Sequence, residues 1–414
     1  MRKIVLSTCF CIIAVTAFAQ LSITGNHQLI GKKIGNDSIT IILFDSITLN
    51  TIIDYKGTNV RFKKYNDPIS ITTLFPPEDA TGYTIEEDEK SIDTIFVIDY
   101  KNYHPHFTSF EPENNPNSQC TEFKLLLGKV VPELSYRTVN GTRYTLPRDF
   151  TVKYQTLSWN ETSASWTTID AIQAVILPAN NIIVPAPLCN TTFTLIGDQY
   201  AADLGLRPDS IKSAVYSAVA VECHITSIVT TRDATNEAEG PTLPGNQKGS
   251  APLDIQFLSN ANKPESATYD WKIFKDKNLQ PLITRTDKDH RYTFTEKGDY
   301  KVKLVTGNSN KCSFTDSITI TISESALKIP NVFTPNGDGF NDEFRVAYKS
   351  LLNFQAWVYN RWGRKVFYWT DPTKGWDGKI NGKEATAGPY FYVIKAVGSD
   401  GFKYKEAGDI NLLR

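Results

Sequence analysis

Short runs of β-branched and aromatic residues, each followed by Gly, Pro, Asn or Asp, recur throughout residues 36–414. Clear examples are residues 38–44, 94–98 and 300–305. Runs of this length, separated by turn residues, are typical of β-sandwiches and barrels. We therefore predict an all-β chain, in which only residues 201–217 have a sequence compatible with some helix.

Composition and charge agree with this prediction and exclude one class of partner. Aromatic residues make up 12% of the 414 residues, and Met occurs only once, which favours strands over helical bundles. Lys and Arg number 44 against 45 Asp and Glu, for a net charge of −1. Such a chain has no global positive field, so we expect no nucleic-acid partner.

The N-terminus has the pattern of a secretory signal peptide. Arg2 and Lys3 precede an apolar run over residues 4–15, and Ala17 and Ala19 form a small-x-small cleavage site. We assign residues 1–19 to this leader. No later stretch has about 18 continuous apolar residues, so no transmembrane span is expected.

Stretches without strand patterning divide the rest of the chain. Residues 111–117 and 236–249 are rich in Asn, Glu, Pro and Gly, and a third break lies at 323–325. The predicted domains are 20–115, 118–235, 240–323 and 326–414, each of a size that suits a sandwich.

Four cysteines remain once Cys9 and Cys11 leave with the leader. An exported chain meets an oxidising compartment, so structural disulfides are favoured over the alternative of free buried thiols. None of the four forms a CxxC pair, which argues against metal or redox chemistry. Three connectivities stay open. The candidates are Cys120, Cys189, Cys223 and Cys312.

The third domain resembles the polycystic-kidney-disease (PKD) type of immunoglobulin-like repeat. The resemblance rests on residues 249–257, on Tyr269-Asp270-Trp271, and on residues 292–294 followed by 298–304. It implies that Trp271 packs between two sheets and that the module carries no chemistry. A fainter echo of the same late-strand pattern at 82–85 and 96–100 suggests an immunoglobulin-like start to the chain. We therefore expect tandem immunoglobulin-like β-sandwich domains ending in a small C-terminal β-sandwich.

Long motifs at the C-terminus resemble the gliding-motility-associated C-terminal domain, the type B sorting domain of type IX secretion. The resemblance implies export through the periplasm to the cell surface or the medium, with the type IX outer-membrane machinery as partner. Whether the domain is cleaved or retained stays open. The residues that carry the resemblance are Asn331, Phe333, Pro335, Asn336, Gly337, Asp338, Gly339, Asn341, Asp342, Asn360, Arg361, Trp362, Gly363, Trp376, Asp377, Gly378, Gly388 and Tyr390.

Two features of this domain each have two interpretations. Asn336, Asp338, Asn341 and Asp342 lie within seven residues and offer oxygen ligands for Ca²⁺, although Asx-turn hydrogen bonding explains the same letters. Apart from this structural Ca²⁺ candidate, no cofactor is expected. Residues 361–362 are either exposed recognition residues, because Arg and Trp dominate binding hot spots, or part of the core.

Aspartate followed by Ser or Thr and then Ile recurs five times, and this resembles the O-glycosylation sequon of bacteria that have type IX secretion. The alternative is a turn residue that leads into a β-branched strand. The candidate acceptors are Ser38, Ser46, Thr94, Ser210 and Ser317.

No convergent acid, base and nucleophile can be identified, and no G-x-S-x-G, P-loop or dinucleotide motif occurs. We therefore predict no enzymatic activity. The leading hypothesis is a surface or secreted protein whose first two domains contact a glycan, a protein or the matrix. The alternatives are a secreted hydrolase with its site in 118–230, and a structural component of the surface apparatus.

Overall fold

The computed structural model describes residues 20–35, 37–67, 69–113, 119–177, 181–238, 240, 248–262 and 268–414. The predicted leader, 1–19, lies outside the described residues. The chain divides into two compact units, Met1–Thr156 with Thr168–Ala218 and Leu157–Thr167 with Val219–Arg414. The finer division into four domains stays a prediction.

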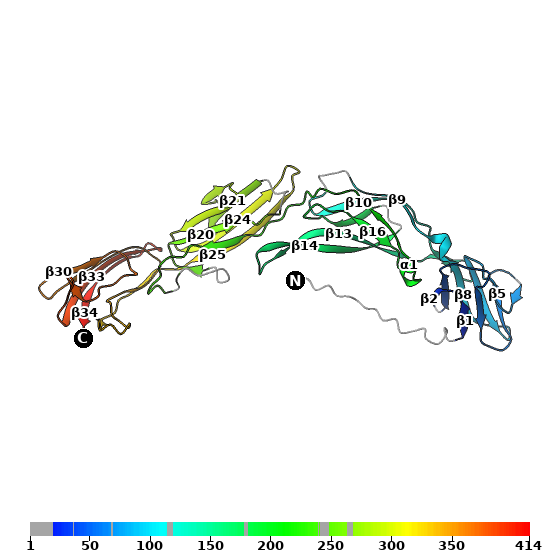
Figure 1. The fold of residues 1–414 in the computed structure, drawn as a ribbon, viewed down its shortest axis with the longest axis horizontal. Helices are drawn as coiled ribbons and strands as arrows, with labels where there is room; N and C mark the ends of the chain where they lie inside the picture. The colour runs from blue at the N-terminus through cyan, green and yellow to red at the C-terminus, as the bar shows by residue number, and fades with distance from the viewer. Residues whose placement is uncertain are drawn as a thin grey trace. The chain divides into compact units, whose positions relative to one another are not determined.

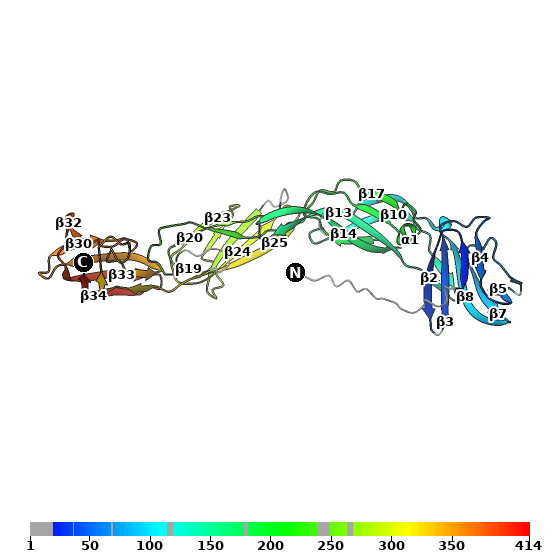
Figure 2. The ribbon, with the colours of Figure 1, turned by 60° about the horizontal axis from the view of Figure 1, so that its bottom comes forward.

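The first unit begins with a sandwich built on a six-stranded sheet (Figure 2). Strand β3 pairs in parallel with β8, whereas the other neighbours in this sheet are antiparallel. A two-stranded sheet, β1 (Leu21–Thr24) with β4 (Ile52–Tyr55), packs over one face. The order of the larger sheet is β2 (His27–Ile34), β3 (Asp37–Phe44), β8 (Lys90–Asp99), β7 (Thr81–Glu87), β5 (Val60–Lys64) and β6 (Ser70–Ile71).

Both faces of β3 are buried, which explains its unbroken apolar run. Ile42 and Phe44 belong to one core, with Ile53 from β4, whereas Ile41 and Leu43 belong to a second core that includes Tyr200. The second core joins the six-stranded sheet to the following sandwich within the same unit.

That following sandwich contains a three-stranded sheet, a four-stranded sheet and a hairpin (Figure 1). Phe110, Phe150 and Phe193 lie in its core. The three-stranded sheet has the order β15 (Asn181–Pro185), β10 (Glu122–Val130), β9 (His106–Pro112), and the four-stranded sheet β14 (Ser165–Leu177), β13 (Arg148–Asn160), β16 (Thr194–Gly197), β17 (Asp209–Lys212). The hairpin pairs β11 (Ser135–Arg137) with β12 (Arg143–Thr145), and the short helices are η1 (Tyr100–Tyr103) and α1 (Gln199–Asp203).

The second unit begins with a sandwich whose core is centred on Trp271, which is fully buried. Its indole Nε1 donates to the carbonyl of Asp287 at 3.0 Å. One sheet has the order β18 (Thr226–Val229), β20 (Leu253–Leu258), β23 (His290–Phe294), and the other β19 (Lys248–Gly249), β25 (Ser313–Ile322), β24 (Gly298–Gly307), β21 (Thr268–Lys275), β22 (Ile283–Arg285).

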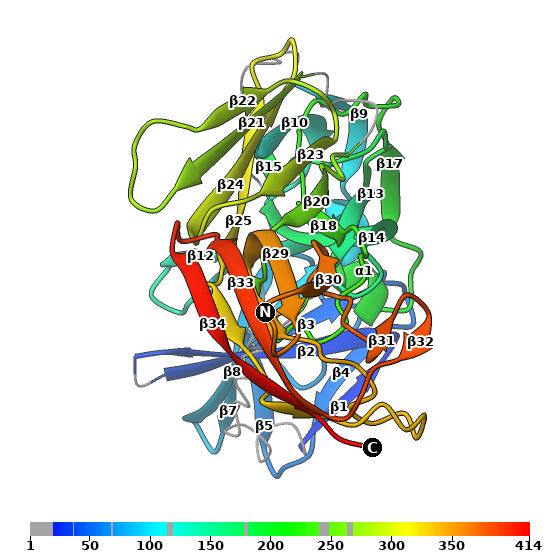
Figure 3. The same cartoon turned by 90° about the vertical axis from the view of Figure 1, so that its left-hand side faces the viewer.

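The C-terminal sandwich completes this unit, and Figure 3 shows β29, β33 and β34 side by side. Trp376, Phe344 and Ile394 are fully buried in its core. The five-stranded sheet has the order β27 (Val332–Phe333), β34 (Lys403–Leu412), β33 (Gly388–Gly398), β29 (Leu351–Tyr359), β30 (Lys365–Trp369). The small pairs are β26 (Ala326–Lys328) with β28 (Ala347–Lys349) and β31 (Lys379–Ile380) with β32 (Lys383–Glu384).

The structure confirms the all-β class, and only the first few residues of the predicted helical stretch, 201–217, are helical. Helix α1 covers only Gln199–Asp203, where the Asp198 side chain caps it by accepting from Ala201 N, and residues 209–212 form a strand instead. Among the described residues, no helix has the length and apolar character needed to cross a membrane.

The cysteine prediction is wrong for two of the four residues. Cys120 and Cys312 are disulfide-bonded, whereas Cys189 and Cys223 are free. Cys223 is fully buried in the Trp271 core, where its thiol packs as a small apolar group. Cys189 lies in the first unit, outside that core. Burial raises the pKa of the Cys223 thiol to about 12.

Candidate functional site

The C-terminal motif residues divide between the core of the sandwich and its loops and turns. Phe333 and Trp376 pack in the core, and the Trp376 indole Nε1 donates to the carbonyl of Lys379 at 2.8 Å. Gly378 has φ +73°, and a Cβ there would lie 2.9 Å from Pro335 Cγ. Three further motif residues accept or donate hydrogen bonds: Asn411 N donates to Asn331 O, Lys379 N donates to Asp377 Oδ1, and Tyr390 Oη donates to Thr386 O. Gly388 has φ +133°.

The Asx-rich loop folds around its own backbone. The Asp342 carboxylate accepts from Gly337 N at 2.6 Å and from Gly339 N at 2.8 Å, and Asp338 accepts from Phe340 N at 2.8 Å. The Phe340 bond is the main cause that lowers the pKa of Asp338. Two further contacts complete the loop, Asn336 Nδ2 to Asp338 Oδ2 at 2.9 Å and Thr334 N to Asn341 O at 2.8 Å.

Of the two interpretations of this loop, the Asx-turn hydrogen bonds are present in the structure. Within the described residues no cluster of three or more His, Cys, Asp or Glu could hold a metal ion. The calcium site stays a prediction.

Residues 361–362 lie at the tip of the β29–β30 hairpin. The Asn360 side chain accepts from Trp362 N at 3.1 Å and from Arg364 N at 3.0 Å, and Gly363 takes φ +75° to close the turn. Trp362 is 81% exposed, and the Arg361 guanidinium lies 5.4 Å from its ring centroid. Trp362 is therefore not a core residue, and its role in recognition stays a prediction.

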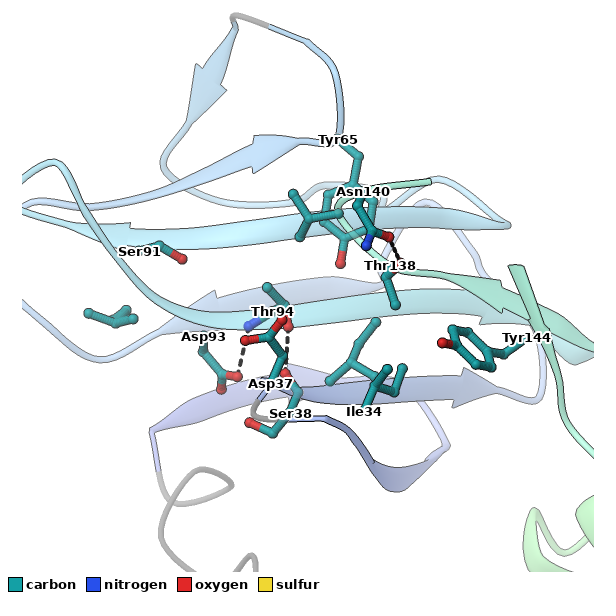
Figure 4. A pocket seen from close by; sticks show the side chains of 13 residues that line it. Ile34, Asp37, Ser38, Tyr65, Ser91, Asp93, Thr94, Thr138, Asn140 and Tyr144 are labelled. Atoms are coloured by element: carbon teal, nitrogen blue, oxygen red, sulfur yellow. Dashed lines mark hydrogen bonds between the residues drawn. The ribbon is translucent and has the colours of Figure 1, made fainter. Parts of the chain in front are cut away.

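A cavity of about 530 Å³ lies in the first unit, where β3 and β8 begin (Figure 4). The parallel pairing of β3 with β8 aligns Thr40 with Ile95, so the two strands begin side by side. This pairing brings two of the Asp-Ser/Thr-Ile motifs to one edge of the sheet. The side chains that line the cavity are Ile34, Asp37, Ser38, Ile39, Tyr65, Ser91, Ile92, Asp93, Thr94, Thr138, Val139, Asn140 and Tyr144.

Two polar atoms that line the cavity are buried without a hydrogen-bond partner among the described residues, Asp93 Oδ2 and Tyr65 Oη. Asp93 Oδ1 accepts from Thr94 N at 2.8 Å, and the Thr94 hydroxyl donates to the carbonyl of Ser38 at 2.7 Å. Burial raises the pKa of Tyr65 to about 12, against a smaller lowering by the nearby Thr94 hydroxyl, and burial also raises the pKa of Asp93. Because buried polar atoms normally have partners, this pair is suited to a polar ligand.

The cavity lining also defines the charge of a suitable ligand. Asp37 and Asp93 are acidic, and the described residues that line the site include no Lys, Arg or His. Tyr144 and Val139, on the β11–β12 hairpin, are 36% and 49% exposed and supply apolar surface at the same cavity. The lining is therefore suited to a neutral or cationic ligand with hydroxyl or amine donors, and is unfavourable to an anion.

The predicted glycosylation acceptors fall into two groups. Ser38 and Thr94 line this cavity, whereas Ser46, Ser210 and Ser317 lie elsewhere on the surface. In three motifs the Asp accepts from the following backbone N–H, as the turn alternative expects: at Ser46, Thr94 and Ser317. O-glycosylation stays a prediction.

Sequence reasoning did not identify this cavity, because it depends on a strand pairing between residues more than 50 positions apart. The only sequence signal was the repeated Asp-Ser/Thr-Ile motif.

These sheets define a protein of immunoglobulin-like sandwich class, and two family comparisons refine this. Residues 111–213 match a fibronectin type III domain, Fn3_FA. Residues 327–412 match CHU_C, the type IX secretion signal domain. The chain therefore carries a type IX secretion signal, which indicates handling by the type IX machinery and export across the outer membrane to the cell surface or medium.

No curated protein matches the chain significantly. Among solved structures, a tetra-tandem repeat from the extending region of a large adhesion protein is similar at 9% identity and a TM-score of 0.21, over 91% of this chain and 99% of that one. The FN1–FN3 domains of chicken CNTN1 are similar at 14% identity and a TM-score of 0.25, over 74% of this chain and 99% of that one.

Proposed function

We propose that this type IX cargo is a non-enzymatic surface or secreted binding protein that takes a neutral glycan in the cavity at the start of β3 and β8. The observation that carries this proposal is the unpartnered Asp93 Oδ2 in that cavity. A sugar hydroxyl would donate to it, and the Tyr65 phenol would donate to a sugar oxygen. Apolar surface at Tyr144 suits the CH-rich face of a sugar ring.

Support for a binding role over catalysis comes from the modules. The fibronectin type III match covers most of 118–230, the region of the alternative hydrolase hypothesis, and this sandwich recurs in cell-surface proteins. Cys223, the one thiol beside a histidine, is buried with a raised pKa, so it is protonated at neutral pH.

Binding of neutral and anionic oligosaccharides to the purified full chain tests the proposal, with Asp93→Asn and Tyr65→Phe as variants. Asn keeps Oδ1 for Thr94 N but replaces Oδ2 with a donor, and Phe removes only the hydroxyl. Each should weaken binding of a neutral oligosaccharide roughly tenfold or more, the effect of one buried hydrogen bond.

Asp45→Asn is the matched control. Asp45 precedes Ser46 in the same motif but does not line the cavity. Equal binding by Asp93→Asn and Asp45→Asn would show that the cavity is not the glycan site. Binding of anionic glycans alone would contradict the proposed neutral ligand.

A further inference from the structure

The outer face of the C-terminal five-stranded sheet is basic and aromatic. The register aligns Gln355, Lys395 and Lys405 in one row, and Asn353, Val397 and Lys403 in the next. A third row aligns Tyr368 with Trp357. Next to this row, Lys365 lies opposite Tyr359. We define the lysine face as Lys365, Lys395, Lys403 and Lys405 around Trp357 and Tyr368.

None of the four ammonium groups of the lysine face forms an ion pair with a described residue, and all four side chains are exposed. Two of them lie near aromatic rings instead, Lys395 Nζ at 5.8 Å from the Trp357 centroid and Lys365 Nζ at 5.8 Å from the Tyr368 centroid. Lys395, Lys403 and Lys405 also line a depression of about 210 Å³.

This positive charge is concentrated in one domain. Residues 326–414 contain 13 Lys and Arg against 9 Asp and Glu, a net charge of +4, whereas the whole chain has a net charge of −1. Lys395 and Lys405 are directly opposite each other on adjacent strands. Like charges in this position destabilise a sheet, so the face carries a cost to folding that an acidic partner would relieve.

We infer that the lysine face is the surface by which the folded C-terminal sandwich docks on an acidic protein surface of the export machinery. Carboxylates of that partner would enter the depression between Lys395, Lys403 and Lys405, and Trp357 with Tyr368 would supply the apolar anchor. The inference rests on the secretion-signal match and not on the glycan cavity, so each can fail without the other.

Charge reversal in the full chain, expressed in its native host, tests the inference. Lys395→Glu/Lys403→Glu should lower the surface and medium fraction roughly tenfold or more, with accumulation in the periplasm, because like charges then face each other across the interface. Folding is not the cause in this variant, since Glu at 395 faces Lys405 and turns a repulsive pair into an attractive one. The melting temperature of the purified variant should equal or exceed that of the wild type.

Two controls separate charge from other effects. Lys395→Arg/Lys403→Arg keeps the charge and should be exported normally. Lys277→Glu/Lys288→Glu makes the same change in net charge at exposed positions outside the C-terminal sandwich and should also be exported normally. Normal export of Lys395→Glu/Lys403→Glu would overturn the inference. A second result would also overturn it: the wild-type chain co-sediments with phosphatidylglycerol vesicles in a salt-sensitive way, and Lys395→Glu/Lys403→Glu does not. The lysine face would then bind lipid phosphate.

Discussion

A buried ion pair in the first unit gives the sharpest stability prediction. Arg148, at the start of β13, and Asp198, which caps α1, have side chains that are 1% and 0% exposed. Arg148 Nε donates to Asp198 Oδ2, and Nη1 donates to the carbonyl of Pro132 at 2.9 Å. Tyr100 Oη donates to Asp198 Oδ1 at 2.6 Å. This bond connects helix η1 to the second sandwich of the same unit.

The perturbation is Asp198→Asn, which removes the charge but keeps an oxygen for Tyr100 Oη and Ala201 N. It leaves the Arg148 guanidinium buried without a counter-charge, at a cost of about 3–5 kcal/mol in the free energy of unfolding. For a unit of this size, that loss lowers the melting temperature by roughly 10 °C. Arg148→Met/Asp198→Asn removes both charges, so it should cost less than the two single changes together, with a coupling energy of about 2 kcal/mol or more.

Hydrogen exchange in increasing urea separates the two units in the full chain. The β13 amides of residues 148–156 report on the first unit, and the amides of β29 report on the second. Only these β13 amides should lose protection in Asp198→Asn. Additive single-variant costs, or unchanged protection at β13, would refute the argument that this pair holds the unit together.

Three further predictions concern the rest of the chain. Trp376→Ala should cost about 3–5 kcal/mol through the cavity it leaves and should abolish export, measured by urea unfolding and fractionation, whereas Trp362→Ala should leave stability within about 0.5 kcal/mol. In native protein at pH 8, a thiol reagent should modify half-buried Cys189 before Cys223, and equal rates would contradict the burial of Cys223. Burial raises the pKa of Cys223 from 9.0 to about 12 and that of Tyr348 from 10.0 to about 12. Between these values the unfolded chain binds fewer protons than the native chain, so the stability of the second unit should fall as the pH rises from about 9. A urea midpoint that stays constant over this pH range would contradict the prediction.

Local structure could be predicted from the sequence because its causes are local. The β-branched and aromatic run Lys365–Trp369 forms β30. Asn-Gly is a pair typical of two-residue hairpin turns, and Asn381-Gly382 has φ values of +47° and +76° between β31 and β32. Trp271, placed between sheets by its resemblance, is fully buried. In β30 and the Asn381-Gly382 turn, neighbouring residues determine the conformation, whereas the burial of Trp271 follows from the resemblance.

The features that the sequence predicted wrongly or did not predict depend on partners far away in the chain. Nothing in the residues around Cys223 shows that it is buried in the Trp271 core and stays free. Arg148 and Asp198 are 50 positions apart, and each alone looks like an ordinary surface charge. A buried charge pair has no local signature because its desolvation cost appears only when the sandwich closes.

The cavity and the lysine face show what tertiary pairing adds to a known motif. Asp37 and Asp93 belong to motifs that, taken singly, are explained by turn formation. Parallel pairing of β3 with β8 brings both motifs to one acidic edge of the sheet. Lys395 and Lys405 are likewise unremarkable along the chain, and antiparallel pairing of β33 with β34 places them opposite each other. At the lysine face the register sets like charges directly opposite each other, which costs folding free energy. The acidic edge in the first unit and the basic face in the second are therefore the grounds for two separate proposals: a hydroxyl-bearing ligand at the first and an acidic protein surface at the second.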